Sequence, residues 1–231
     1  LICFLIGISV YSYQGIKTGT QERVKETIEE ATATPVSGKV VVLDAGHGTP
    51  DEGAQSSKGT TEAETNLKIA LKVQNLLEQS GCTVILTRSD EKAIYDLDKT
   101  TLKEKKISDI RNRVKIGNSA SADIFVSIHL NKIPQQQYWG WQCFYSSKSE
   151  ESMKLAKILQ SSLNDAIQKD NKRVAMKLDT VYIMKHVEIP ISIVECGFLS
   201  NPEEEQQLLD DEYQNKLAWG IYNGIIEYFT K

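Results

Sequence analysis

Two of the three histidines in this 231-residue chain follow apolar runs that are typical of buried strands. His47 comes after KVVVLDAG, and His129 comes after ADIFVSI. Because functional side chains gather at the carboxyl ends of strands in open α/β sheets, we expect both imidazoles at one sheet edge. A catalytic zinc site needs about three ligands of the His, Asp, Glu or Cys type and a fourth position open to water. The two histidines therefore predict two ligands of such a site.

A third ligand is expected among the acidic residues that follow His47 in the chain. These residues are Asp51, Glu52, Glu62 and Glu64, and their spacing alone leaves all of them open. Glu195 is a different kind of candidate, because it ends the apolar run ISIV. A carboxylate at the end of a buried strand is costly unless it is paired or takes part in chemistry. The alternative for Glu195 is a surface carboxylate at the end of a strand.

Strands and helices alternate through the first half of the chain. The expected strands span residues 39–43, 83–87 and 123–128, and the expected helices span residues 64–80 and 109–119. The first helix has a broad apolar stripe and is closed by Gly81. Residues 89–108 are polar and basic with few apolar anchors, so we expect a long surface excursion there, near the site.

The second half continues the same pattern. Expected strands span residues 142–145, 181–184 and 191–194, and expected helices span residues 151–169 and the apolar stripe from Leu217 to Tyr228. The total is about six strands and at least four helices. The predicted fold class is therefore a single α/β domain with a mostly parallel or mixed central sheet flanked by helices.

The N-terminal 37 residues differ in composition from the rest of the chain. Residues 1–13 are apolar and uncharged, but a spanning helix needs roughly 20 apolar residues. We interpret them as a truncated membrane anchor or signal segment, the alternative being a buried element of the domain. Residues 14–37 are polar and read as a linker, and residues 38–231 as the catalytic domain. This organisation predicts export across a membrane.

Charge and cysteine content exclude some classes of function. The chain has 27 basic and 31 acidic residues, a net charge of −4, and no long block of either sign. Nucleic acid is therefore not an expected partner. The four cysteines share no close spacing, so we expect neither a cysteine-rich metal site nor a disulfide framework.

Four blocks of the sequence, in order, resemble the zinc-dependent N-acetylmuramoyl-L-alanine amidases of bacterial cell walls. They are VVLDAGHG, TEAETNLKIA, ADIFVSIHLN and IVECGFLSNPEE. The resemblance implies zinc bound by His47, Glu62 and His129, with Glu62 selected by the Asn and Leu that follow it. It also implies that Glu195 is the catalytic acid and base. Ala45 and Cys196 occupy positions where members of the family vary.

The same resemblance implies a substrate and a location. The reaction would be hydrolysis of the amide between the lactyl group of muramic acid and L-alanine in peptidoglycan. The segments HLNKIP and WGWQCFY look most like the germination-specific branch that acts on spore cortex. We therefore expect an exported protein of the cell envelope or of the cortex-facing side of a membrane. The family contains members that need an activating protein partner, so such a partner is an open expectation.

Several neighbouring residues could support this site. Asp44 and Asn131 lie within three residues of a histidine and could orient an imidazole, or make ordinary loop hydrogen bonds. Arg88 and Arg113 could meet stem-peptide carboxylates or form surface ion pairs.

Other candidates have weaker claims. His186 belongs to no matching motif, and we expect it to be non-catalytic. Tyr138, Trp139 and Trp141 could form a wall for stacking sugars, although hydrophobic packing is the simpler account.

Two rival functions use the same residues differently. A catalytically silent peptidoglycan-binding protein on the amidase fold should lack a ligand or the acid and base, and all four residues are present. A thiol hydrolase would use Cys196, but the adjacent Glu195 disfavours the thiolate that this chemistry needs.

Overall fold

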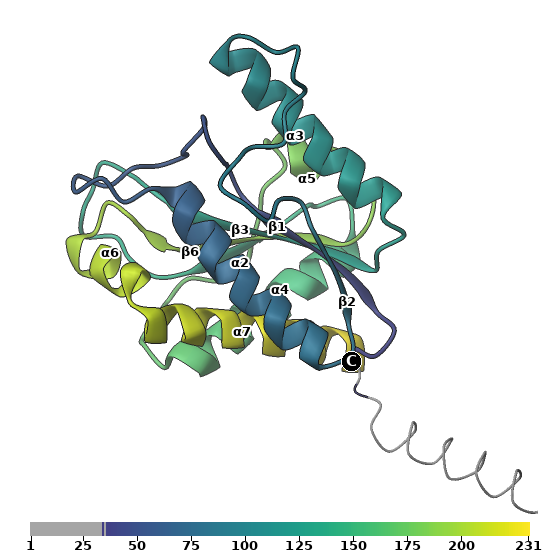
Figure 1. The fold of residues 1–231 in the computed structure, drawn as a ribbon. Coiled ribbons are helices and arrows are strands. Elements are labelled where there is room, and N and C mark those ends of the chain that lie inside the picture. Colours follow the sequence, from purple (N-terminus) through teal and green to yellow (C-terminus); the bar gives the residue numbers. More distant parts are fainter. Residues whose placement is uncertain (1–33, 35) are drawn as a thin grey trace, which may run out of the picture. The chain divides into compact units, whose positions relative to one another are not determined.

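A six-stranded mixed sheet forms the centre of the part of the chain described by the computed structural model, residues 34 and 36–231 (Figure 1). The strands are β1 (Val40–Ala45), β2 (Thr83–Leu86), β3 (Ile124–Asn131), β4 (Gln142–Tyr145), β5 (Met176–Lys177) and β6 (Ile191–Phe198). Their order in the sheet is β2-β1-β3-β6-β4-β5. The first four in this order are parallel, and β4 joins antiparallel to β6. The predicted fold class is confirmed.

The central strands are apolar on both faces because helices cover both sides. In β1, Val41 and Leu43 belong to one core cluster while Val42 belongs to the other, and all three are fully buried. Parallel strands covered on both faces have this continuous apolar character. It explains why the run KVVVL predicts a strand without polar alternation.

The helices divide between the two faces of the sheet. They are α2 (Glu62–Gln79), α3 (Leu102–Ser119), α4 (Glu150–Ile167), α5 (Tyr182–His186), α6 (Pro202–Leu209) and α7 (Asp211–Thr230). Helices α2, α4 and α7 lie on one face of the sheet, and α3 and α5 lie on the other (Figure 1). Side chains of the first group pack in the larger core cluster and those of the second in the smaller one. The molecule therefore has three layers, helix, sheet and helix, in the described part.

The chain changes direction across the sheet between β1 and β3. From β1 it passes through α2 to β2 on one side, and from β2 it returns through α3 to β3 on the other side of β1. A crevice opens outside the carboxyl ends of the strands at such a switch point. His47 follows β1 and His129 lies near the end of β3, so both are at this crevice.

Two of the predicted elements are wrong. Residues 181–184 were expected as a strand, but residues 182–186 form the short helix α5. The run VYIM is too short for periodicity to separate a strand from a buried helical turn. The predicted surface excursion of residues 89–108 is also shorter, because α3 begins at Leu102. A capping box, in which Thr101 and Glu104 each bond the other's backbone, fixes that start.

The predicted N-terminal segments lie largely outside the described residues. This holds for the leader, residues 1–13, and for most of the linker, residues 14–37. Val36 is fully buried in the larger core cluster, two residues before the predicted start of the domain. Among residues 34 and 36–231, no helix combines the length and apolar character needed to cross a bilayer.

Candidate metal centre

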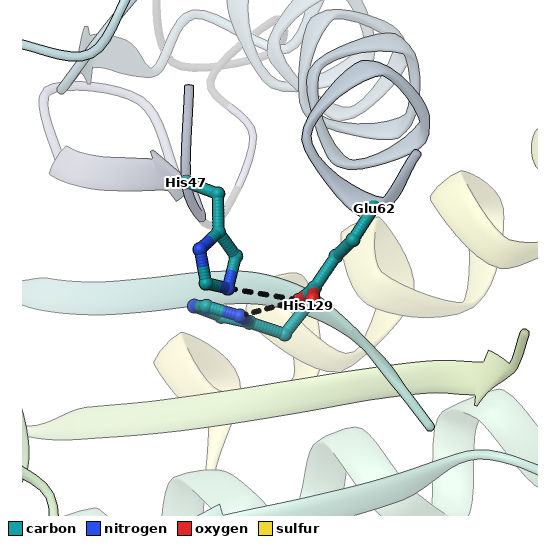
Figure 2. Close-up of side chains that lie close together, drawn as sticks. All are labelled: His47, Glu62 and His129. Atoms are coloured by element: carbon teal, nitrogen blue, oxygen red, sulfur yellow. Dashed lines mark hydrogen bonds and ion pairs between the residues drawn. The ribbon is translucent and has the colours of Figure 1, made fainter. Parts of the chain in front are cut away.

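Three predicted ligands meet at the crevice. The side chains of His47, Glu62 and His129 each direct one donor atom to a common point, and these atoms lie within 4.8 Å of one another (Figure 2). Glu62 Oε1 lies 2.8 Å from His129 Nδ1 and 3.3 Å from His47 Nε2. The two imidazole rings meet edge to face, with centroids 5.1 Å apart. Of the four acidic candidates, Glu62 is the one that contacts both histidines.

The turn after β1 presents His47 in an uncommon backbone conformation. His47 has φ of 62°, in the left-handed region that non-glycine residues rarely adopt. Gly46, just before it, leaves room for the second histidine. A Cβ placed on Gly46 would lie 2.3 Å from two ring atoms of His129. The glycine is therefore needed for the close approach of the β1 turn to the β3 imidazole.

Glu62 is held as an ionised carboxylate at the start of α2. Thr61 caps this helix through its side chain, so the first helical residue is Glu62. Its Oε2 accepts from the backbone N–H of Ala54, and its Oε1 from that of Leu130, at 2.8 and 3.1 Å. Burial alone would raise the pKa of Glu62, but the two neighbouring imidazoles outweigh it and lower the pKa.

Glu195 lies opposite His129 on the adjacent strand. The two residues are register partners in the β3–β6 pair, and the register shifts just after them. Glu195 Oε2 is buried and has no hydrogen-bond partner among the described residues. Burial raises the pKa of Glu195 to about 7; charge on His129 opposes the rise and the Glu62 carboxylate adds to it. The site therefore contains one carboxylate that touches both imidazoles and one that remains unbonded.

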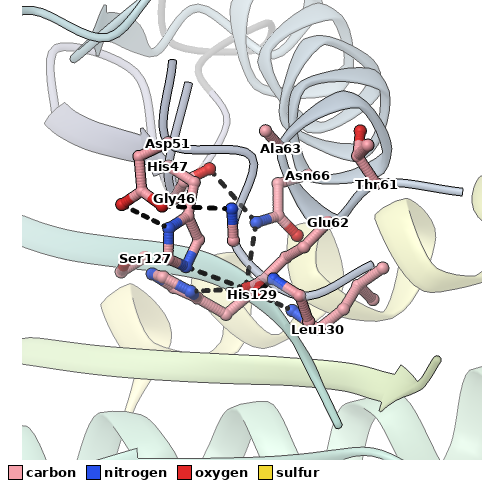
Figure 3. A network of polar contacts seen from close by, with 12 residues as sticks. Gly46, His47, Asp51, Thr61, Glu62, Ala63, Asn66, Ser127, His129 and Leu130 are labelled. Carbon is pink, nitrogen blue, oxygen red and sulfur yellow. Dashed lines mark hydrogen bonds and ion pairs between the residues drawn. The ribbon is translucent and has the colours of Figure 1, made fainter. Parts of the chain in front are cut away.

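Asp51 is the partner of the first imidazole. Its Oδ2 lies 3.2 Å from His47 Nδ1, on the opposite side of the ring from Glu62 (Figure 3). Burial alone would lower the pKa of His47, but Asp51 and Glu62 raise it to about 9. Lys106 of α3 binds the other oxygen of Asp51 at 2.9 Å. Neither Glu52 nor Glu64 contacts the described histidines; Glu64 pairs with Lys68 in solvent.

Of the two alternatives left open for Asp44 and Asn131, the structure does not show the orientation of an imidazole for either residue. Asp44 is buried and accepts hydrogen bonds from Arg113, Thr87 and Ser127. No hydrogen bond joins the Asn131 side chain to another described residue; its backbone carbonyl accepts from the N–H of Leu199. Proximity in sequence was a misleading guide: Asp44 points into the buried arginine network, and the strand register shifts between His129 and Asn131.

Two buried arginines shape the turn that carries His47. Arg113 donates to the carboxylate of Asp44 and to the backbone carbonyls of Ala45 and His47. Arg88 donates to the carbonyls of Ala45 and Gly46 at 2.8 and 3.0 Å. Both guanidiniums are almost completely buried. They are therefore neither surface ion pairs nor free to meet a substrate carboxylate.

A cleft of about 500 Å³ opens beside the His47–Glu62–His129 group, called the metal cluster below. His47, His129 and Glu195 line one side of it. Residues of α3 and of the segment around α5 also line it, among them the apolar Ile107, Ile110 and Val181 and the charged Lys106 and Asp109. A volume of this size is typical of pockets that bind small molecules or part of a larger substrate. Two of the three candidate metal ligands and the unbonded carboxylate of Glu195 therefore face the same cleft.

The remaining predicted residues lie away from this chemistry. His186 is exposed, stacks on Tyr182 and does not line the catalytic cleft. Trp141 is fully buried and donates to Asn164, while Trp139 is partly exposed. The packing account therefore holds for Trp141.

The three cysteines in the described part of the chain do not supply a nucleophile. Cys82, Cys143 and Cys196 are free thiols, and all three are buried. Burial raises the pKa of Cys196, and the nearby charges of Glu195 and Glu204 raise it further. A fully buried thiol of this kind is chemically inert. The rival thiol-hydrolase mechanism is excluded.

The donor set suits a catalytic metal. Two imidazoles and one carboxylate converge on one point, which is the ligand set of hydrolytic zinc sites that keep a position open. The second nitrogen of His47 is bonded to Asp51, as is usual for a metal-bound imidazole. The fold and this cluster together define a single-domain α/β protein with the candidate metal centre of a hydrolase.

Comparison with known proteins gives the family. Residues 41–227 match the Amidase_3 family model, described as N-acetylmuramoyl-L-alanine amidase. The chain belongs to this family, and its activity is that of an N-acetylmuramoyl-L-alanine amidase. Membership of this family also favours an active amidase over the alternative function, a catalytically silent peptidoglycan-binding protein.

Individual relatives agree with this family. The chain is 39% identical over 197 residues to the germination-specific N-acetylmuramoyl-L-alanine amidase of Bacillus subtilis, covering 85% of this chain and 82% of the relative. It is similar to the CwlD amidase of Clostridioides difficile, solved in complex with the GerS lipoprotein, with a TM-score of 0.81 and 41% identity. That match covers 83% of this chain and 98% of the other. The catalytic domain of CwlV from Bacillus (Paenibacillus) polymyxa is 33% identical, with a TM-score of 0.70, over 83% of this chain and 98% of that domain.

Proposed function

We propose that this amidase uses zinc, held by His47, Glu62 and His129, with Glu195 as the acid and base of the reaction. The observation that carries the proposal is the unbonded buried oxygen of Glu195, placed in the same cleft as a cluster of two imidazoles and a carboxylate. Zinc bound there would polarise the scissile carbonyl and make water a better nucleophile. One ligand carboxylate leaves the metal with a net positive charge.

The chain's own residues would move the proton. Water attacks the lactyl carbonyl carbon, and Glu195 accepts the proton that the water loses. The bond between carbon and nitrogen then breaks, and Glu195 returns that proton to the departing amino group of L-alanine. The products are a free lactyl carboxylate on the sugar strand and a free stem peptide. Glu195 can serve both steps because its second oxygen has no competing partner.

Asp51 would fix the tautomer of the first ligand. By accepting from Nδ1 of His47, it leaves Nε2 of the ring with a lone pair directed at the cluster. An outer carboxylate of this kind orients a metal-bound imidazole and makes it more basic. Lys106 in turn holds Asp51 in place from α3.

The biological setting is part of the same proposal. The relative with 39% identity is named as germination-specific, and the CwlD structure contains a lipoprotein. We extend both to this chain: cortex peptidoglycan as substrate, action on the exported side of a membrane, and a protein partner that activates it. Residues 1–13 would form an anchor or signal segment, 14–37 a linker and 38–231 the catalytic domain.

The test measures zinc content and stem-peptide release from purified peptidoglycan for the wild type and three variants. Glu195→Ala should lose activity and keep zinc, whereas His129→Ala should lose both. Glu64→Ala, an exposed glutamate on α2, is the matched control and should change neither. Activity retained in Glu195→Ala would refute the assigned acid and base. Zinc bound by the wild type without release would show that the partner is required.

A further inference from the structure

A second groove lies between α2 and α7, apart from the catalytic cleft. Its volume is about 550 Å³. Residues of both helices line it, among them Lys72, Asn75, Gln79, Asn215, Lys216 and Trp219. Most of these side chains are polar or aromatic and none belongs to the metal cluster. Hydrolysis of the amide in the catalytic cleft does not involve this groove.

The spacing of the lining residues builds the groove from two facing helix stripes. On α2 the stripe runs through Lys72, Leu76 and Gln79, and residues spaced in this way share one helix face. On α7 the corresponding stripe runs through Asn215 and Trp219. The two helices are tied at one end by the hydrogen bonds of Lys72 to Asp211 and Asn215 and at the other by that between Ser80 and Tyr222.

An aromatic platform forms one wall. Trp219 is 50% exposed, although tryptophan is usually well buried. Tyr222 lies one turn along and supports it, with ring centroids 5.3 Å apart. The neighbouring groove residue Ala218 is small and buried, so it does not cover the face of the indole. An exposed indole above a shallow floor offers a flat apolar face to a flat ligand.

The polar wall has unused hydrogen-bonding capacity. The side-chain amide of Gln79 donates to Oδ1 of Asn75, and that of Asn215 donates to the carboxylate of Asp211. Gln79 Oε1 and Asn75 Nδ2 then have no partner among the described residues. An acceptor and a donor on neighbouring amides match hydroxyl and acetamido groups, which are both donors and acceptors.

The groove also has an uncompensated positive charge. Lys72 is paired with Asp211. Lys216 is exposed and makes no ion pair or hydrogen bond with any residue in the described part of the chain. An anionic group in the groove would therefore find one free ammonium at its edge.

We propose that this groove binds the peptide-free product strand, a chain of N-acetylated amino sugars with free lactyl carboxylates. A sugar ring would stack on Trp219, its hydroxyl and acetamido groups would bond the amides of Asn75 and Gln79, and a lactyl carboxylate would pair with Lys216. This inference rests on the proposed function, because hydrolysis of the lactyl amide creates that carboxylate. The substrate strand, still amidated, lacks this lactyl carboxylate.

The position of the groove fits a strand that extends beyond the catalytic cleft. Glu62, at the metal cluster, and Asn75, in the groove, are 13 residues apart on α2. At 1.5 Å per residue this is about 20 Å along the helix, the length of a few sugar units. A strand already cut in the cleft could thus be retained while the next amide is presented.

The test measures binding of peptide-free strands and of chitotetraose, a neutral amino-sugar tetramer, to the full chain by calorimetry. Trp219→Ala should weaken both ligands about tenfold, the loss of one stacked ring. Lys216→Gln should weaken only the peptide-free strand, by about threefold. Matched controls are Trp139→Ala, a partly exposed tryptophan elsewhere, and Lys157→Gln, an exposed unpaired lysine on α4. Both controls should bind as the wild type does.

The outcomes separate this inference from the proposed function. Neither ligand has a scissile amide, so binding is read without catalysis, and hydrolysis of a short soluble muropeptide is measured in parallel. Trp219→Ala should leave that hydrolysis unchanged, because a short substrate does not reach the groove. Wild-type affinity in Trp219→Ala, with its unfolding curve unchanged, would overturn the inference. A change in sedimentation of Trp219→Ala would overturn it too, since the groove would then join copies of the chain. Trp219→Phe should restore part of the affinity.

Discussion

Replacing Gly46 by alanine should disable the metal centre without replacing a ligand. The new Cβ would lie 2.3 Å from Cε1 and Nε2 of His129, whereas ordinary contacts begin near 3.4 Å. The ring must therefore move by about 1 Å, or the turn must move away by the same amount. Functional groups have to be held within about 0.5 Å, and an error of about 1 Å costs roughly a hundredfold in rate.

The assay for Gly46→Ala is zinc affinity, measured by competition with a chromogenic chelator, together with stem-peptide release. We expect affinity and rate each to fall about a hundredfold. Overpacking should also lower the free energy of unfolding by about 1–3 kcal/mol. Stability loss alone would not explain a weaker metal site, so a control with the same kind of clash is needed.

Gly224→Ala provides that control. Its Cβ would lie 2.8 Å from Cδ2 of Leu159, in the core between α7 and α4, far along the chain from the ligands. We expect a similar loss of stability with unchanged zinc affinity. If Gly46→Ala binds zinc as tightly as the wild type, the account of a glycine that makes room for the second imidazole is wrong.

Three further predictions concern groups around the site. Asp51→Asn should weaken zinc binding by about 10- to 100-fold, measured by chelator competition, while Glu64→Gln should not change it. Asp44 has a pKa below its ordinary value of 3.8, because the buried arginine and two hydroxyls outweigh the opposing effect of burial. Its stabilisation is therefore complete well above pH 4 and lost as the pH falls through the lowered pKa. Asp44→Asn should be less stable by about 3 kcal/mol near neutral pH, and urea unfolding should show this gap narrowing in acid. Burial raises the pKa of the Cys143 and Cys196 thiols, so peptide mapping should find neither alkylated at pH 8 until denaturant is added.

The parts of the fold that could be predicted are those with long, regular patterns. The buried strand before His47 and the amphipathic helix after it are settled by local composition, and the structure has both. The short run at residues 181–184 could not be assigned in this way, since four apolar residues fit either period. The start of α3 was missed although a signal existed, because Thr101 and Glu104 have the spacing of a capping box.

The site divides in the same manner. Residues at strand ends could be placed at one crevice, because topology brings those ends together. Asp51 could not be separated from three other carboxylates by spacing, and the partner of His47 depends on how one loop folds back. The roles of Arg88 and Arg113 could not be predicted either. Each binds backbone carbonyls more than 40 positions away, and because every residue has a carbonyl, the sequence does not indicate which one is bound.

The guanidinium contacts to the β1 turn bear on how activity can be lost among related chains. Arg113 and Arg88 donate to the backbone carbonyls of Ala45, Gly46 and His47, and these bonds do not depend on the side chains of the three residues. Exchange of Arg113 would leave the His47 carbonyl without its described donor, at about 1–3 kcal/mol, and would remove the ion pair to the buried Asp44, so the turn would be held less firmly. A descendant could therefore keep every ligand and the acid-base glutamate and still be inert, so an intact motif does not by itself certify an active enzyme.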